Sequence, residues 1–232
     1  VDALLKVVKP TAIVFKNDSS GRRQEQLERN VEVVLEEALP DPSRHADDFL
    51  REARGRILDH LLENGGRALV LCTSWHFVRE LADYLRPDLA DANIELLVQG
   101  EAALKQLLLA KQNQPTSVLL GTDSLWEGID VPGEALTMVV VTRFPFQPPG
   151  HPLTEARTKA VEARGGNGFR DYSLPEAVLK FRQGFGRLVR PDSDRGRVVI
   201  LDPRIRTKTY GREFLRSLPK GAMADPQGEG ST

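Results

Sequence analysis

The residues best suited to chemistry lie between Gln183 and Arg190, a stretch that reads Gln-Gly-Phe-Gly-Arg-Leu-Val-Arg. A helix turns about 100° per residue, so it would place Gln183, Arg187 and Arg190 on one narrow face. One amide and two guanidiniums on a single face suit a polyanion, because the planar guanidinium fork matches the oxygens of a phosphate. The alternative is a solvated helix end that carries ordinary surface arginines.

Two glycines, Gly184 and Gly186, lie within this predicted helix, although each costs about 1 kcal/mol relative to alanine. Their presence predicts that something approaches the backbone closely, and the arginine face beside them favours a polyanion in that place. The face opposite the arginines has the spacing of a core stripe, which is formed by Val178, Phe181, Phe185 and Leu188.

A second informative stretch runs from Gly121 to Gly133 and contains three glycines and three carboxylates after an apolar run. Glycines such as Gly128 allow tight turns that leave backbone N–H groups free. Glu127 and Asp130 can accept hydrogen bonds from ribose hydroxyls, from a metal-bound water, or from the arginines described above. The alternative is a polar loop anchored by a buried Trp126. A paired-carboxylate hydrolase is disfavoured, because no other carboxylate or histidine reads as a partner.

The elements that must position these residues alternate along the chain. Continuous apolar runs, typical of buried parallel strands, predict strands at 68–72, 94–98, 117–120, 136–141 and 198–201, and a weak alternation predicts one at 31–35. Segments of helical period predict helices at 47–62, 77–85, 102–111, 153–163, 174–189 and 210–218. This alternation predicts an α/β fold, an open and mostly parallel sheet with helices on both faces. Ligands of such sheets bind beyond the carboxyl ends of the strands, where Thr73-Ser74, Gln99-Gly100 and Gly121-Thr122 lie.

Composition narrows the classes of function. The formal net charge is −1, so nucleic-acid binding requires a local basic patch. The single cysteine, Cys72, excludes an intramolecular disulfide and any all-cysteine zinc site or iron–sulfur cluster held by this chain alone. The four histidines lack metal-ligand spacing. No apolar run approaches the ~20 residues of a membrane span and no signal-peptide pattern begins the chain, so we expect a cytoplasmic setting and no membrane partner.

No Gly-x-x-x-x-Gly-Lys-Ser/Thr loop is present to cradle phosphates, and no Asp-Glu pair of the kind that holds Mg²⁺ follows a buried strand. A phosphate-seeking arginine face without a phosphate loop favours one half of a split nucleotide site. Another domain would supply the other half, and the arginines would then stabilise charge on the transferred phosphoryl group.

Three segments resemble helicase motifs IV, V and VI and follow each other in that order along the chain: Leu69 to Ser74, Gly121 to Gly133 and Gln183 to Arg190. With them, the chain resembles the second RecA-like motor domain of DinG/XPD-type superfamily 2 DNA helicases, and especially the bacterial DinG branch. Arg143 to Phe146, and Leu201 to Arg204 followed by Tyr210-Gly211, are also similar to DinG. The likeness covers roughly residues 39–219, which divides the chain into a linker (1–40), the RecA-like domain (41–219) and a disordered tail (220–232).

The resemblance implies roles for named residues. Arg187 and Arg190 would face the phosphates of ATP, and Gln183 would contact the γ-phosphate or the attacking water. Coupling of the nucleotide site to the DNA track would fall to Glu127, Gly128 and Asp130. Contacts to DNA would come from Thr73, Ser74, Trp75, Gln99, Gly100, Gly121 and Thr122, and they would be mostly to the phosphate backbone, which carries no sequence information. For Trp75, stacking on a base and anchoring in the core remain alternatives.

The family implies 5′-to-3′ unwinding of DNA in the bacterial cytoplasm, driven by ATP and Mg²⁺ that the first motor domain mainly binds. Single-stranded DNA and that first RecA-like domain are the implied partners, and many members carry an iron–sulfur cluster in the first domain. This chain alone would not hydrolyse ATP. The alternatives are a nucleic-acid-binding module without motor activity, an RNA helicase domain, since phosphate contacts do not distinguish DNA from RNA, and a nuclease, which no carboxylate cluster here supports.

Overall fold

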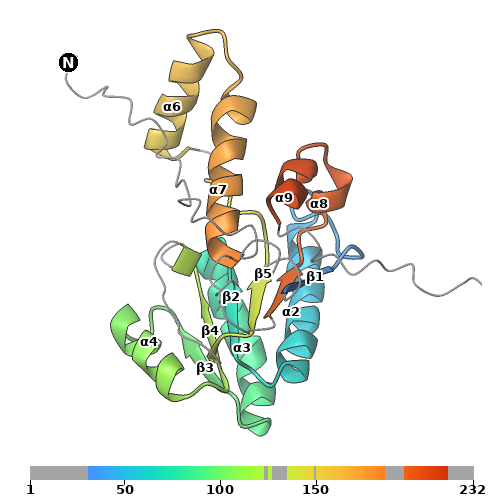
Figure 1. Ribbon diagram of the computed structural model, residues 1–232, viewed down its shortest axis with the longest axis vertical. Helices are drawn as coiled ribbons and strands as arrows, with labels where there is room; N and C mark the ends of the chain where they lie inside the picture. Colours follow the sequence, from blue (N-terminus) through green and yellow to red (C-terminus); the bar gives the residue numbers. More distant parts are fainter. Residues whose placement is uncertain (1–30, 123–124, 127–134, 149, 186–195, 219–232) are drawn as a thin grey trace, which may run out of the picture.

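The computed structural model describes residues 31–122, 125–126, 135–148, 150–185 and 196–218. Within them, six parallel strands form one sheet in the order β1-β6-β5-β2-β4-β3 (Figure 1). The strands are β1 (Val31–Leu35), β2 (Ala68–Leu71), β3 (Glu95–Val98), β4 (Ser117–Gly121), β5 (Met138–Val141) and β6 (Gly196–Ile200). The predicted α/β fold with an open parallel sheet is therefore confirmed.

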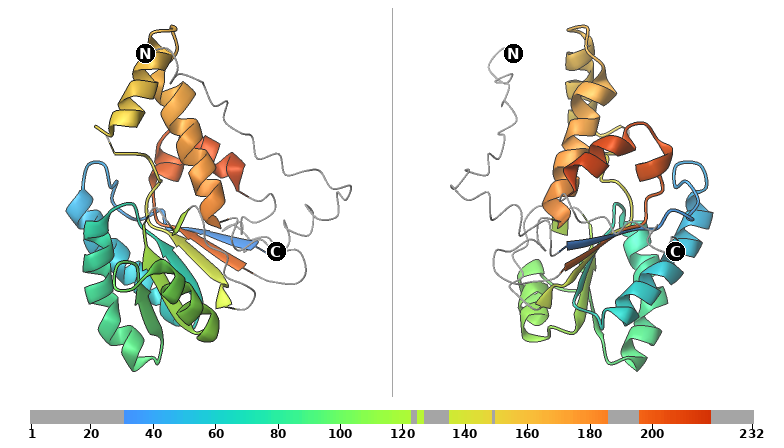
Figure 2. Two further views of the ribbon diagram at one scale, coloured as in Figure 1. Left: turned by 90° about the vertical axis from the view of Figure 1, so that its left-hand side faces the viewer. Right: turned by 45° about the vertical axis from the view of Figure 1, so that its right-hand side comes forward.

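Helices cover both faces of this sheet, as expected from the apolar character of its central strands. The first face packs on α2 (Ala46–Glu63) and α3 (Trp75–Asp91), and the second on α4 (Leu104–Asn113), α7 (Leu174–Phe185) and α9 (Gly211–Ser217). Figure 2 shows α2 and α3 on one side of the sheet and α4 on the other. In β2, Ala68 and Val70 belong to the first core while Leu69 and Leu71 belong to the second, so every residue of the strand is buried.

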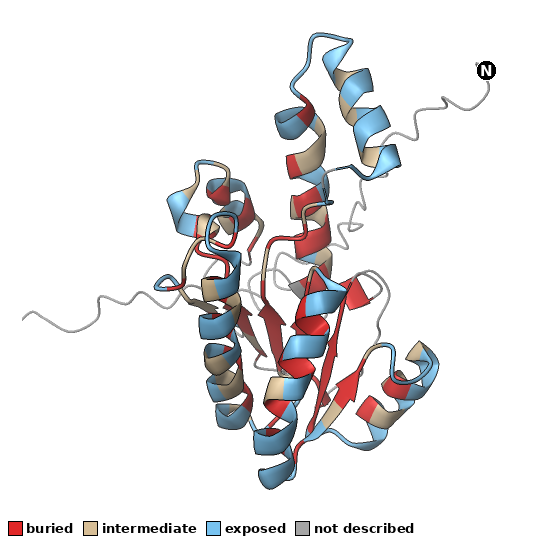
Figure 3. Ribbon diagram, turned by 180° about the vertical axis from the view of Figure 1, so that it is seen from behind, coloured by how far each residue is buried: buried red, intermediate tan, exposed pale blue. Residues whose placement is uncertain are grey.

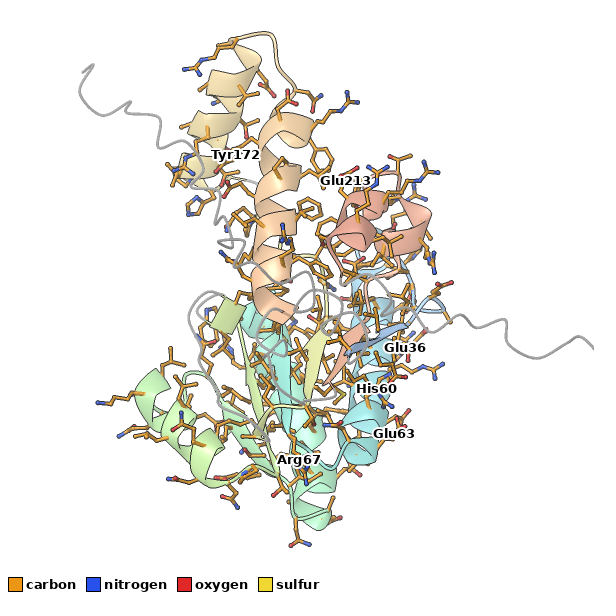
Figure 4. All side chains as sticks on the ribbon, viewed as in Figure 1. Glu36, His60, Glu63, Arg67, Tyr172 and Glu213 are labelled. Atoms are coloured by element: carbon orange, nitrogen blue, oxygen red, sulfur yellow. The ribbon has the colours of Figure 1, made fainter. Side chains whose placement is uncertain are left out.

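Strand β1 lies at the edge of the sheet and pairs with β6. Ion pairs hold this edge: Arg197 of β6 donates to Glu32 at 2.9 Å and to Glu63 of α2 at 3.0 Å. His60 of α2 lies 2.8 Å from Glu36, just after β1 (Figure 4). The segment 1–40, which the sequence assigns to a linker, therefore contributes one strand to the sheet. Residues 1–30 and the predicted tail from 220 lie outside the described residues.

Two elements after β5, helix α6 (Pro152–Glu162) and the first part of α7, project beyond the sheet (Figure 1). Helix α6 has no buried residue (Figure 3) and reaches α7 through a π-helical turn at Phe169–Ser173. Arg157 of α6 donates to the Tyr172 hydroxyl at 3.1 Å. The predicted helix at 174–189 is confirmed as far as Phe185, and its remainder lies outside the described residues. None of the described helices has the length and apolar character that a membrane crossing requires.

Candidate functional site

The candidate DNA-contacting residues gather at one edge of the sheet. Because all six strands are parallel, their carboxyl ends meet at the same edge. Strands β2, β4 and β3 are neighbours, and Thr73-Ser74, Gly121-Thr122 and Gln99-Gly100 lie at their respective ends. The structure thus brings together the positions that the sequence pattern selected separately.

At this edge, the side chain of Gln99 holds the ends of β3 and β4 together. Its Oε1 accepts a hydrogen bond of 2.7 Å from the backbone N–H of Thr122. A Cβ at Gly121 would lie 2.2 Å from that oxygen and 2.5 Å from Cδ1 of Leu125, so only glycine fits beneath the amide. Gly121 and Thr122 are both buried. The three residues thus shape the edge of the sheet, and the contacts to DNA expected of them stay a prediction.

Thr73, Ser74 and Trp75 are accessible at the end of β2. Ser74 has extended backbone geometry and caps α3, because its Oγ accepts from the N–H of Phe77 at 3.3 Å. Thr73 is half-buried, whereas Ser74 is exposed. Trp75, the first residue of α3, is 45% exposed. Anchoring in the core, one of the two readings of Trp75, is therefore wrong.

The segment after β4 and the end of α7 meet at a buried tryptophan. Trp126 is fully buried, and its indole N–H donates to the carbonyl of Cys72 at 3.1 Å. A Cβ at Gly184 would lie 2.8 Å from the Trp126 ring and 2.9 Å from Leu71 Cδ1. Something does approach the helix backbone closely, as the glycine predicts, but at Gly184 it is a core indole and not a polyanion.

Two of the three residues proposed to face the nucleotide, Arg187 and Arg190, lie outside the described residues, as do Gly186 and the proposed coupling residues Glu127, Gly128 and Asp130. Gln183 is described and half-buried, next to Gly184 on α7. Trp126 directly precedes Glu127 in the chain, and Gly184 closely precedes Arg187. The contact between Trp126 and Gly184 therefore brings together the two candidate nucleotide-site stretches, 121–133 and 183–190, near the start of each.

A buried cluster supports the same edge at the ends of β5 and β6. The Asp202 carboxylate is fully buried and accepts from the Phe144 backbone N–H at 2.8 Å and from Arg204 Nε at 2.8 Å. Although burial lowers the pKa of Arg204, its hydrogen bonds to Asp202 raise that pKa above the ordinary value. The Phe144 ring stacks on Phe214 of α9 with centroids 3.7 Å apart. Sequence reasoning gave Asp202 and Arg204 no role, since their pairing depends on this fold.

Arg143, which follows β5, is half-buried, and two of its nitrogens, Nε and Nη2, are buried without a hydrogen-bond partner. Its guanidinium lies 4.8 Å from the centroid of the Phe49 ring. Burial lowers the pKa of Arg143, against the opposing effect of Asp202. Among the described residues, no group of three or more histidines, cysteines or carboxylates is placed to hold a metal ion.

Comparison with known proteins gives relatives for most of the chain. A family model for the helicase C-terminal domain matches residues 57–221. The ATP-dependent DNA helicase YoaA of Haemophilus influenzae is 43% identical over 169 residues, which cover 72% of this chain and 26% of YoaA. The Bacillus subtilis protein named 3′-5′ exonuclease DinG is 37% identical over 191 residues, which cover 82% of this chain and 19% of that protein.

A solved structure of apo XPD superposes with a TM-score of 0.62 and covers 84% of this chain and 40% of its own, at 16% identity. At that identity, the likeness supports the fold. The chain spans a fifth to a quarter of the length of its curated relatives. The match from residue 57 to residue 221 includes all three motif segments. The chain therefore belongs to the helicase C-terminal domain family.

Proposed function

We propose that this chain is the second motor domain of a bacterial, cytoplasmic, ATP-dependent DNA helicase. Arg187 and Arg190 act as arginine fingers, Gln183 contacts the γ-phosphate or the attacking water, and the strand ends contact single-stranded DNA. The observation that carries the proposal is the contact between Gly184 and Trp126, because it ties the helix that leads to the arginines to the segment that leads to Glu127 and Asp130. A change in position of the helix that leads to the arginines is thereby transmitted to the end of β4, which contacts DNA.

ATP and Mg²⁺ are held mainly by the first motor domain of the complete protein. The sequence supports this division, because it has no phosphate loop. In hydrolysis, water attacks the γ-phosphorus and the bond from that phosphorus to the bridging oxygen of ADP breaks. The two guanidiniums neutralise the charge that develops on the phosphoryl oxygens and on the leaving oxygen.

Arginine variants of the complete helicase test the finger role. We expect Arg187→Ala or Arg190→Ala to lower DNA-stimulated ATP turnover by on the order of 10³, with a much smaller loss of affinity for single-stranded DNA. Arg182→Ala is the matched control, since Arg182 is an exposed arginine of α7 outside the proposed face. Wild-type turnover in either finger variant would refute the role.

The 232-residue chain alone provides the complementary test. We expect it to hydrolyse no ATP above background, because the phosphate loop belongs to the other half of the site. Turnover should appear only in the protein that contains both motor domains. Robust ATPase activity of the isolated chain that disappears in Arg190→Ala would contradict a split site.

Binding without motor activity is the second candidate, and the exposure of Trp75 at the sheet edge favours nucleic-acid binding as such. The two candidates separate in the complete protein by ATP turnover: a motor shows DNA-stimulated turnover that Arg187→Ala or Arg190→Ala removes, whereas a passive module binds single-stranded DNA without such turnover. Measurement of affinity across salt concentrations with DNA and RNA strands also decides between a DNA and an RNA substrate.

Two finer features of the proposal rest on the family likeness. Unwinding in the 5′-to-3′ direction is tested with partial duplexes that carry either a 5′ or a 3′ single-stranded tail. An iron–sulfur cluster would belong to the first motor domain, because this chain has a single cysteine, Cys72, and that residue is buried.

A further inference from the structure

The two tryptophans of the chain have opposite environments. Trp126 is fully buried and its indole N–H is hydrogen-bonded, whereas Trp75 is 45% exposed at the carboxyl edge of the sheet. A large aromatic side chain left in water gives up stabilisation that burial would provide. The exposed part of the Trp75 ring therefore adds little to the stability of the fold. It lies beside the strand ends that the proposed function assigns to single-stranded DNA.

The Trp75 ring is nevertheless held in place. Its backbone is the first residue of α3, which the Ser74 hydroxyl caps. The edge of its six-membered ring lies beside Gly100, whose hypothetical Cβ would be 3.5 Å from Cζ3 and 3.8 Å from Cη2. Gly100 has φ of +99°, a conformation that side chains disfavour. An indole that is positioned before binding loses little conformational entropy when a second ring stacks on it.

A cation lies one helical turn from this ring. Arg79 is exposed, and its Nε donates to the carbonyl of Trp75 at 3.4 Å. No carboxylate of the described residues lies within ion-pair distance of Arg79, since Glu80 approaches His76 at 3.4 Å and Glu101 pairs with Arg86 at 2.6 Å. Its charge remains available to an anion, next to an available aromatic face.

We propose that Trp75 and Arg79 form a subsite for one nucleotide of single-stranded DNA. The indole stacks on the base, and the guanidinium contacts the adjoining phosphate. The inference rests on the proposed function and deepens it, because it adds a contact to a base to a track of backbone contacts. Every base has a π-face, so the subsite tolerates any sequence but requires that a base be present.

Comparison of intact and abasic strands in the complete helicase tests the stacking contact. We expect Trp75→Ala to weaken binding of an oligothymidylate by about 5- to 150-fold, the range of one base–aromatic stack. Affinity for an abasic strand of equal length should not change, which also shows that the variant is folded. Trp75→Phe should keep most of the affinity. Leu109→Ala is the control, since Leu109 is an exposed apolar residue of α4.

The phosphate contact has a different signature. Arg79→Gln should weaken binding of both strands to the same extent and should lower the slope of log affinity against log salt by about 1. Two results would overturn the subsite. The first is an equal loss of affinity for the intact and the abasic strand in Trp75→Ala, and the second is full affinity for the intact strand in both Trp75→Ala and Arg79→Gln. The second result would leave a protein partner as the ligand of the exposed indole. A wild-type helicase that bound no single-stranded DNA would instead overturn the proposed function.

Discussion

Lys111 shows, at the scale of one residue, how a buried cation can serve the fold. Its side chain is fully buried at the end of α4, and its Nζ donates to the carbonyls of Ser117 at 2.6 Å and Pro115 at 3.2 Å. These bonds fix the turn that starts β4, the strand that leads to Gly121. Burial, aided by the charge of Arg67, lowers the pKa of Lys111 to about 7. A neutral amine keeps both hydrogen bonds, because each needs only one N–H.

This low pKa predicts a pH dependence. Between pH 7 and about 10 the unfolded chain binds a proton at Lys111 that the folded chain does not, so the free energy of unfolding rises with pH, by at most about 1.4 kcal/mol per unit from this group. In Lys111→Met this contribution should be absent. Urea unfolding of both proteins at pH 6, 7, 8 and 9 measures it, and a constant difference between them at all four values would refute the shift.

At the scale of elements, α7 is set in place by a residue without a side chain. Gly184 lets the helix backbone lie against Trp126 and Leu71, and no Cβ fits there. The glycine therefore sacrifices helix propensity for contact with the segment after β4. In the proposed function, the same contact aligns the helix that carries Gln183 with the edge of the sheet.

A pair of identical substitutions separates packing from propensity. Gly55→Ala in α2, where the nearest atom is the Tyr84 hydroxyl at 4.0 Å, should stabilise the fold by about 1 kcal/mol. Gly184→Ala should instead destabilise it by about 1–3 kcal/mol, because the added methyl overpacks the contact with Trp126. Denaturant unfolding gives both values. An equal gain in the two variants would mean that α7 is not held by this contact.

Local patterns predict the sheet and its helices well, and they fail where contacts are distant in sequence. The apolar run at 68–72 identifies a buried strand because both faces of β2 are covered. The neighbour of Gly184 could not be read from its helix, since Trp126 belongs to another segment. The burial of Gly121 depends on Gln99 in the same way. The π-helical turn at Phe169–Ser173 has no periodic signal that distinguishes it from an ordinary helix start.

Strand β1 shows the limit of local patterns at the scale of the whole molecule, because only a weak alternation predicts a strand at 31–35 and the sequence assigns residues 1–40 to a linker. The structure pairs it in parallel with β6 and buries Val31 and Val33 against the second core. An edge strand needs fewer apolar residues than a central one, since its outer edge and part of one face meet water. Its contribution to the domain therefore comes from pairing with β6. A local pattern cannot show this pairing, because β6 is distant in sequence.

A chain shortened to begin at Asp41 tests this boundary. It removes β1, two buried valines and the Glu32–Arg197 ion pair, and it leaves the backbone of β6 as an unpaired edge. We expect a lower free energy of unfolding by several kcal/mol, from about 1.5–3 kcal/mol per buried side chain, together with concentration-dependent association through the exposed edge. A chain that begins at Arg29, and so keeps β1, is the control. Equal stability of the two shortened chains would show that the domain begins at residue 41, and monomeric behaviour of the shorter one would show that β1 does not protect β6.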